Sequence, residues 1–295
     1  MTILLTEQKA VQRSELETPN QSPEPTESLA VKHFAWQAKP PAGVKQSLIE
    51  DIPVDIFPTQ NALFDRIAAE IQFGKILEKP RTVFSINIHG ANMATRYPRF
   101  KKIMQTVDTM ICDGIGIVLG SKMAKTVPIP CRHCAGDFLP DLVQYLADKG
   151  LTCYFLASEP GVAERAVENM AKKTPNHTIL GYHHGYVLKD KVLENKVIDE
   201  INTLKPDILF VGFGMPLQEF WIEDNLSRLN VGAVFPFGAT LDYISQKVPR
   251  CPVWLGQLGL EWLFRFCLEP KRMFERYIQG NPWFMYRILK QRVFN

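Results

Sequence analysis

The stretch PDILFVGFGMPLQEFW, residues 206–221, contains the pattern from which the fold can be inferred. Its apolar run Ile208–Val211 is typical of a short strand that is buried on both faces of a sheet. Gly212 and Gly214 end this strand, and Pro216 suits the first position of a following helix. In α/β folds, ligands bind where a buried parallel strand ends in glycines before a helix, often through a phosphate. The stretch therefore predicts an α/β fold that binds a nucleotide or another anion at this turn.

The same alternation continues on both sides of this stretch. Short apolar runs separated by helical patterns of about 10–15 residues predict βαβ units and a mainly parallel, Rossmann-like sheet flanked by helices. The expected strands are Ile52–Phe57, Val83–Asn87, Thr109–Cys112, Thr152–Leu156, Thr178–Tyr182, Ile208–Val211 and Ala233–Phe237. The expected helices are one capped by Thr59 and running to Leu77, then Thr95–Val107, Asp137–Lys149, Val162–Lys173, Leu193–Leu204 and Pro216–Leu229.

The two ends of the chain differ in composition from this middle part. Thr18–Ser28 is rich in Pro, Ser, Thr and Glu, so it buries too little apolar surface to order itself. The C-terminal segment lacks a strand pattern and predicts two or three helices, broken at Pro270 and Pro282. We expect three parts: a disordered tail over 1–48, an α/β catalytic domain over 49–255 and a helical C-terminal appendage over 256–295.

Composition limits the class of protein. Hydrophobic residues make up 46% of the chain and charged residues 22%, which is ordinary for a globular protein. The net charge of +3 is too small to argue for nucleic acid as a partner. No signal peptide and no run of about 18 apolar residues is seen, so we expect a reducing cytoplasm. Cys112 and Cys153 fall in apolar runs and are expected to be small buried hydrophobes.

The glycines of residues 212–214 do not complete a dinucleotide fingerprint. Leu217 holds the place of the third glycine, and the following strand ends in Gly238 and Ala239 rather than in an acidic residue for a ribose. These departures disfavour a nicotinamide dehydrogenase. The plainer alternative, that the glycines only end a strand, stays open.

A second candidate site is ICDGIG, residues 111–116, where a strand runs directly into Asp113 before Gly114 and Gly116 open a helix. An aspartate at the C-terminal end of a parallel strand is reachable by substrate, and its neighbours can tune it for catalysis. The alternative is an Asp–Gly turn or a helix N-cap.

The third candidate is Cys131-Arg-His-Cys134. A zinc site would need two further ligands at matching spacing, and no second cysteine pair exists. A redox site would place the motif at a helix start, whereas this one follows a Pro-rich run. Arg132 is the stronger candidate for function, because arginine binds pyrophosphate oxygens with a planar fork.

The C-terminal segment from Gly256 holds seven Lys or Arg against three Glu, with aromatic residues between them. Arg265, Arg272 and Arg276 would share one face of a continuous helix, although Pro270 can kink it. Basic and aromatic residues on helices suit an anionic membrane surface, and a docked helix with a solvated charged face is the alternative. The chain has no Asp-x-Asp, so cationic side chains and helix dipoles would have to neutralise a nucleotide-sugar diphosphate.

Taken together, these stretches resemble the WecG/TagA/CpsF glycosyltransferases, glycosyltransferase family 26. The similarity covers about Ile52 to Arg276. It is carried by SINIHGANM (85–93), CDGIGIVLGSKM (112–123), RHCAGD (132–137), FLASEPGVAERA (155–166), GYHHGY (181–186), PDILFVGFGMPLQEFWI (206–222), GAVFPFGATLDY (232–243), VPRCPVWLGQLGLEWLFR (248–265) and EPKRMFERY (269–277).

The resemblance assigns roles to particular residues. It implies that Asp113 is the general base, and that Ser85 and Asn87 contact donor or acceptor. The family's Gln corresponds to Gln218, beside Glu219, and both are expected to bind substrate. The family's C-terminal arginines are expected to bind the diphosphate; they correspond to Arg265, Arg272 and Arg276. Three departures stand out: Cys112 replaces a proline, Ser85 replaces a threonine, and Arg132 lies one residue further from Asp113 than the family pattern.

The activity that the resemblance implies is sugar transfer from a UDP-sugar to an undecaprenyl-diphosphate-linked sugar, with inversion and without metal or other cofactor. It implies an N-acetylmannosamine-type or related hexose, cell-surface polysaccharide biosynthesis, and a cytoplasmic enzyme held at the inner face of the plasma membrane by its C-terminal segment. One alternative is a non-catalytic nucleotide-sugar-binding or scaffold subunit, and another is an NAD(P) oxidoreductase. The donor sugar, the acceptor and the oligomeric state, including a homo-oligomer, are left open.

Overall fold

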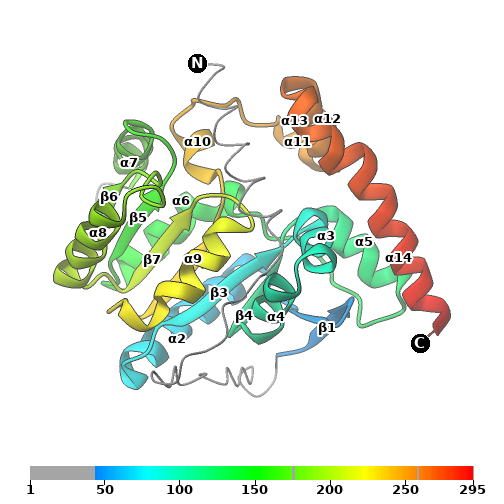
Figure 1. Ribbon diagram of the computed structural model, residues 1–295, viewed down its shortest axis with the longest axis horizontal. Coiled ribbons are helices and arrows are strands. Elements are labelled where there is room, and N and C mark those ends of the chain that lie inside the picture. The colour runs from blue at the N-terminus through cyan, green and yellow to red at the C-terminus, as the bar shows by residue number, and fades with distance from the viewer. Residues whose placement is uncertain (1–43, 175–176, 258, 295) are drawn as a thin grey trace, which may run out of the picture. The chain divides into compact units, whose positions relative to one another are not determined.

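The computed structural model describes residues 44–174, 177–257 and 259–294 (Figure 1). Six parallel strands form its central sheet in the order β4-β3-β8-β7-β5-β6, and β1 pairs antiparallel with β2 beside it. The strands are β1 Gln46–Ile49, β2 Ile52–Asp55, β3 Arg81–Ile86, β4 Thr109–Cys112, β5 Cys153–Ala157, β6 Ile179–His183, β7 Ile208–Gly212 and β8 Ala233–Pro236. The expected α/β fold with a parallel sheet is confirmed.

Helices connect these strands and cover both faces of the sheet. Up to the end of the sheet they are α2 Gln60–Leu77, α3 Ile88–Arg96, α4 Pro98–Thr106, α5 Ile115–Met123, α6 Ala135–Asp148, α7 Val162–Lys173, α8 Lys191–Leu204, α9 Leu217–Asn225, a 3₁₀-helix Leu226–Arg228 and α10 Thr240–Ile244. Beyond the sheet follow α11 Val253–Gln257, α12 Glu261–Leu268, α13 Pro270–Met273, a π-helix Phe274–Gln279 and α14 Gly280–Phe294.

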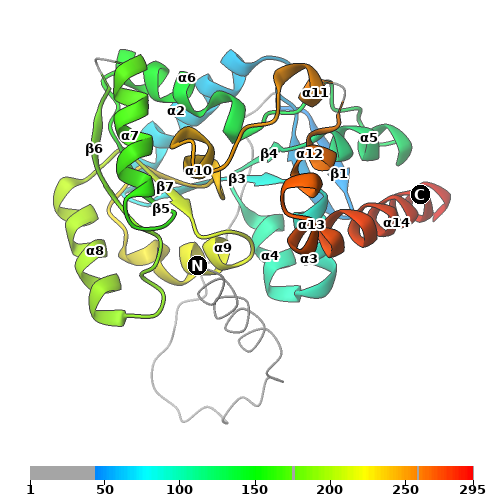
Figure 2. The same cartoon turned by 90° about the horizontal axis from the view of Figure 1, so that it is seen from above.

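Helices lie on both sides of the sheet in Figure 2. The core consists of two apolar layers, one on each face of the sheet. Successive strand side chains point to opposite faces. In β7, Leu209 and Val211 therefore pack with α3, α4, α8 and α9, whereas Ile208 and Phe210 pack with α2, α6 and α7. The inner strands β5, β7 and β8 are buried on both faces and consist almost entirely of apolar residues, which is why the sequence shows them as continuous apolar runs. The edge strand β6 is only partly buried.

Most of the expected elements agree with the structure to within a few residues. Thr59 caps α2 as predicted, its side chain accepting from the N–H of Ala62 at 3.2 Å. The helix expected over Thr95–Val107 is wrong in extent, because Pro98 begins a new helix and separates α3 from α4. Strand β1 was not expected and begins at Gln46, three residues before the predicted domain start; residues 1–43 of the predicted tail lie outside the described residues.

The C-terminal helical region is confirmed, but only one of its two expected breaks is correct. Pro270 begins α13 after a non-helical Glu269, as predicted. Pro282 does not end a helix and instead lies in the first turn of α14. The residue before α14 closes a π-helix. Proline cannot donate to the preceding turn, and a widened turn is where a helix tolerates that missing hydrogen bond.

Helix α14 is part of the core. Phe284 and Ile288 are fully buried, and a Cβ added to Gly120 of α5 would lie 3.0 Å from the Phe284 ring. On the same helix, Arg287 binds Glu50 with two hydrogen bonds of 2.5 and 2.9 Å and donates to Asn92 of α3 at 2.9 Å. The C-terminal helix is therefore fastened to the α/β fold by packing and by charge.

Among the described residues, no helix combines the length and the apolar character needed to cross a membrane.

Replacing Phe284 by alanine should lower the free energy of unfolding by about 3–5 kcal/mol, because it leaves a cavity against α5. Chemical denaturation measures this change. Tyr286, on the opposite face of α14 and 57% exposed, is the matched control, and its alanine variant should lose about 1 kcal/mol or less. Equal losses for the two variants would contradict the packing of α14.

Candidate active site

Polar side chains gather where the parallel strands end. Asp113 follows β4, Asn87 follows β3, and the two strands are neighbours in the sheet. The loops after β8, β7 and β5 continue the same edge. All six strands run in one direction, so their C-terminal ends meet at one edge, which is where α/β folds bind ligands.

Asp113 is held by the strand next to it. Its backbone N–H donates to the carbonyl of Ile86 at 2.8 Å and so extends the β3–β4 ladder by one residue. Gly114 follows with φ of +106°, a conformation that favours glycine, and turns the chain into α5. The Asp113 side chain is half-buried. This geometry presents a carboxylate at the sheet edge, open to a ligand.

Asn87 orients this carboxylate. Its Nδ2 donates to Asp113 Oδ2 at 3.2 Å, while its Oδ1 accepts from the N–H of Gly90 at 3.0 Å and caps α3. The cap determines which way the amide faces, so its N–H group must point toward Asp113. The structure thus brings together two of the predicted site residues. Ser85 lies on β3, two residues before Asn87, in register with Ile111 of β4 and half-buried.

Gln218 lies inside the protein, only 1% exposed. Its Oε1 accepts from the N–H groups of Gly214 at 3.1 Å and Gly238 at 3.2 Å, and its Nε2 donates to Glu219 at 2.8 Å. Gly212 belongs to the same packing, since an added Cβ would lie 2.5 Å from the Gly238 carbonyl oxygen. In this structure Gln218 therefore joins the loops after β7 and β8, and its contact with a sugar stays a prediction.

Glu219 is also 1% exposed, and its Oε2 has no hydrogen-bond partner among the described residues. Burial raises the pKa of Glu219 to about 7, although hydrogen bonds from Gln218 and from its own backbone oppose the shift. Sequence reasoning expected a substrate contact at Glu219. The structure places there a buried carboxyl group whose pKa lies close to neutral pH.

The three C-terminal arginines lie on three different pieces of helix. Arg265 is on α12, Arg272 on α13 and Arg276 on the π-helix, so the break at Pro270 separates Arg265 from the other two, and the three do not lie on one continuous helix. Arg276 nevertheless interacts electrostatically with Arg265, Arg272 and Asp113. Burial and then the two neighbouring arginines lower its pKa, while Tyr277 and Asp113 oppose the shift. Its Nε is buried with no partner among the described residues, which suits an incoming anion.

His89 is a member of this cationic cluster that sequence reasoning missed. It lies in the first turn of α3, two residues after Asn87. Burial lowers the pKa of His89 to about 3, with further contributions from Arg276, Arg96 and Arg272. A neutral histidine among arginines indicates a strongly positive site. In the sequence, His89 was recognisable only as a polar residue just after the end of a strand, within a stretch already quoted for the family.

Arg132 pairs with carboxylates of its own chain. Its Nη1 lies 3.1 Å from Asp137 and 3.5 Å from Glu261 of α12, and Arg250 pairs with the same two carboxylates. Arg132 also interacts electrostatically with Asp113. It therefore lies near the site, but it also ties the C-terminal helices to the start of α6. Its role toward a diphosphate stays a prediction.

Two further polar groups lie beyond β5 and β8. Ser158 Oγ and Asp242 Oδ1 are both buried and, apart from their interaction with each other, have no partner among the described residues. The Ser158 backbone accepts from Gly185 at 2.8 Å and donates to Gly212 at 3.3 Å, which joins the loops after β5, β6 and β7. Burial raises the pKa of Asp242, while Lys247 and the Ser158 hydroxyl oppose this shift. Both residues lie in stretches already quoted for the family, but the sequence assigned neither a role.

The Cys131–Cys134 motif forms no metal centre with the other described residues, among which no cluster of three His, Cys, Asp or Glu is placed to hold an ion. Cys131 lies 3.5 Å from His133, which itself bonds the carbonyl of Phe57 at 2.9 Å. Burial raises the pKa of Cys134 to about 12, so it is a neutral thiol. Cys112 and Cys153 are buried thiols, as predicted.

Comparison with known proteins identifies the family of this chain. A family model described as glycosyl transferase WecG/TagA/CpsF matches residues 48–295. A protein of Bacillus spizizenii (strain ATCC 23059 / NRRL B-14472 / W23) is 29% identical over 197 residues, which cover 67% of this chain and 74% of the relative. A protein of Staphylococcus aureus (strain NCTC 8325 / PS 47) is 26% identical over 211 residues, covering 71% and 80%.

Both relatives are named N-acetylglucosaminyldiphosphoundecaprenol N-acetyl-beta-D-mannosaminyltransferase. The resemblance seen in the sequence is thereby confirmed, and the reading as an enzyme that transfers a hexose is confirmed with it. The chain belongs to the glycosyl transferase WecG/TagA/CpsF family.

Proposed function

We propose that this protein transfers a sugar from a UDP-sugar to an undecaprenyl-diphosphate-linked sugar, with inversion and without a metal ion. The observation that carries the proposal is the Asp113–Asn87 pair at adjacent strand ends, in electrostatic contact with Arg276. A carboxylate oriented by an amide and interacting with a half-buried arginine suits a general base beside an anionic leaving group. The two named relatives act on a diphosphoundecaprenol acceptor by their names, which supports a lipid-linked acceptor here.

The reaction would be a single displacement. Asp113 takes the proton from an acceptor hydroxyl, that oxygen forms a bond to the anomeric carbon, and the bond from this carbon to the diphosphate of UDP breaks. Attack opposite to the leaving group inverts the anomeric centre. Arg265, Arg272 and Arg276 would stabilise the charge that grows on the diphosphate, a task that metal ions perform in other transferases.

The loops beyond β5 and β8 support a nucleotide as the donor's carrier. Ser158 Oγ and Asp242 Oδ1 are buried with no partner beyond each other among the described residues, and they come from the loops on either side of the glycine turn after β7. Buried polar atoms are normally hydrogen-bonded, so a ligand with hydroxyl groups would complete them. A ribose offers such hydroxyls, and the diphosphate would then extend toward Arg276.

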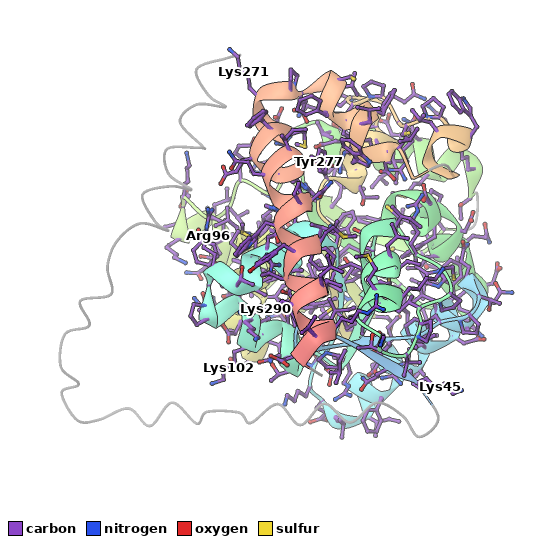
Figure 3. The ribbon with its side chains drawn as sticks, turned by 90° about the vertical axis from the view of Figure 1, so that its right-hand side faces the viewer. Lys45, Arg96, Lys102, Lys271, Tyr277 and Lys290 are labelled. Carbon is purple, nitrogen blue, oxygen red and sulfur yellow. The ribbon has the colours of Figure 1, made fainter. Side chains whose placement is uncertain are left out.

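A membrane surface is the proposed source of the acceptor. On the side of the C-terminal helices away from the core, apolar residues are exposed, including Phe274, Ile278, Trp283, Tyr286, Leu289 and Val293. Figure 3 views this side and shows Lys271 near one end of the segment and Lys290 near the other. Apolar side chains with basic residues around them suit an interface with anionic lipid. The same segment carries Arg276. Bound to the cytoplasmic face of the membrane, this segment would present a lipid-linked acceptor to the site.

Replacing Asp113 by asparagine should lower kcat by about 10²–10⁴-fold, because asparagine cannot accept the proton. Binding of UDP-sugar, measured by calorimetry, should change little. The assay screens UDP-sugars against an N-acetylglucosaminyl-diphosphoprenol acceptor, with and without EDTA. Full activity of the variant would remove Asp113 from the mechanism, and loss of wild-type activity in EDTA would refute metal independence.

Substitutions of Asn87 separate its two roles. Serine keeps a helix cap but loses the amide N–H that faces Asp113, whereas alanine loses both. We expect turnover to fall in both variants, and the free energy of unfolding to fall by about 1 kcal/mol only in the alanine variant. Parallel kinetics and chemical denaturation test this. A serine variant with wild-type kcat would show that the bond to Asp113 is dispensable.

Replacing Trp283 and Tyr286 together by serine should weaken binding to phosphatidylglycerol vesicles about tenfold or more, since burying one large apolar side chain contributes about 1.5–3 kcal/mol. Vesicle flotation measures the binding, with phosphatidylcholine vesicles as the uncharged comparison. Ile76→Ser on α2, at a side chain that is 76% exposed, is the matched control. Unchanged flotation of the double variant would exclude this face, and a dimer that it converts to a monomer would assign the face to a second copy of the chain.

A further inference from the structure

The side chain of Gln218 links two loops that belong to the ligand-binding edge. Its Oε1 accepts from the N–H of Gly214, after β7, and from the N–H of Gly238, after β8. Strands β7 and β8 pair in parallel, so these loops are neighbours. An oxygen shared by two backbone donors sets the spacing of the loops. Any change in the Gln218 amide would therefore be passed to both.

The orientation of this amide depends on Glu219. Two backbone N–H groups face one atom of Gln218, so that atom must be the oxygen, and the nitrogen must find an acceptor elsewhere. Glu219 Oε1 provides it at 2.8 Å, inside the protein. Without that acceptor the amide nitrogen would be a buried donor with no partner, which is costly. Glu219 therefore completes the arrangement that holds the two loops.

Among the described residues, no charged side chain acts on the Glu219 carboxyl group. Glu219 Oε2 is buried and without a partner among the described residues. Burial is the largest influence on the pKa of Glu219, which it raises to about 7. Charged side chains on the helices that contact α9 bind other α9 residues: Arg99 of α4 pairs with Glu223 and Asp224, and Glu194 of α8 accepts from Trp221 and Asn225.

We propose that Glu219 is a positioning residue that acts in its neutral, protonated form, orienting Gln218 so that the loops after β7 and β8 can receive the anionic donor. Loss of the proton leaves a negative charge with one unsolvated oxygen beside these loops. That charge must draw in water or move the side chain, and it also repels a diphosphate. Donor affinity therefore falls as the pH rises through the titration of Glu219. The inference rests on the proposed function only in taking the donor to be anionic.

The test measures the dissociation constant of the UDP-sugar found by the donor screen, by calorimetry from about pH 6 to about pH 8.5. If only the neutral form binds, the apparent constant of the wild type rises about tenfold at one pH unit above the pKa of Glu219. Glu219→Gln keeps an acceptor for Gln218 and cannot ionise, so its constant should stay near the low-pH wild-type value throughout. Glu219→Ala should bind weakly at every pH.

Glu223→Gln is the matched control. It makes the same replacement of a carboxyl group by an amide on the same helix. The Glu223 side chain is 33% exposed and paired with Arg99, so the pH dependence of binding should remain that of the wild type. Equal pH dependence in the wild type and Glu219→Gln would overturn the proposal. So would wild-type binding that does not change with pH.

A ligand-free measurement separates this inference from the proposed function. Infrared difference spectra between about pH 6 and about pH 8.5 should show the loss of one protonated-carboxyl band, which is missing in Glu219→Gln. If the glutamine variant does not fold, Glu219→Ala serves the same assignment. Absence of this band would refute the neutral state of Glu219 even if UDP-sugar binds. If the band is present but no UDP-sugar binds, the proposed donor is refuted and the neutral state of Glu219 stands.

Discussion

Burial of the parallel sheet on both faces is the constraint on which the rest of the structure depends. Strands such as β7 contribute side chains to an apolar layer on each side, so they have no polar face to offer a substrate. Polar groups that act on a ligand are confined to the edge where the strands end. Asp113, Asn87 and the glycine loops after β7 and β8 all lie there because the strands share one direction.

Two amide side chains organise this edge in the same way. Asn87 accepts from the backbone with its oxygen and donates to Asp113, and Gln218 accepts from two backbone N–H groups and donates to Glu219. The two carboxyl groups differ in their surroundings. Asp113 is half-buried and interacts electrostatically with Arg276. Glu219 is buried without a cation, which favours its neutral form.

The C-terminal helices have an inner and an outer side with different tasks. Phe284 and Ile288 fill the core beside α5, and Arg287 pairs with Glu50 near the start of the described chain. Further along the same segment, Arg276 reaches the neighbourhood of Asp113. The apolar residues of the outer side remain exposed. Packing of the inner side against the core therefore fixes where the outer side lies. A membrane bound to the outer side would stay at a constant distance from the edge of the sheet that carries Asp113.

The sequence by itself determined the α/β class and the strand positions, and it singled out Asp113 at a strand end, because apolar periodicity and residues at strand ends are local signals. It also identified the family, which the comparisons confirm, and Asn87 was singled out through that resemblance. Local pattern misplaced the break at Pro282, although the expected break at Pro270 is correct. Only the tertiary structure showed that His89 joins those arginines and that Gln218 and Glu219 are buried. Burial and electrostatic contact depend on which segments distant in sequence come together, and no local pattern records that.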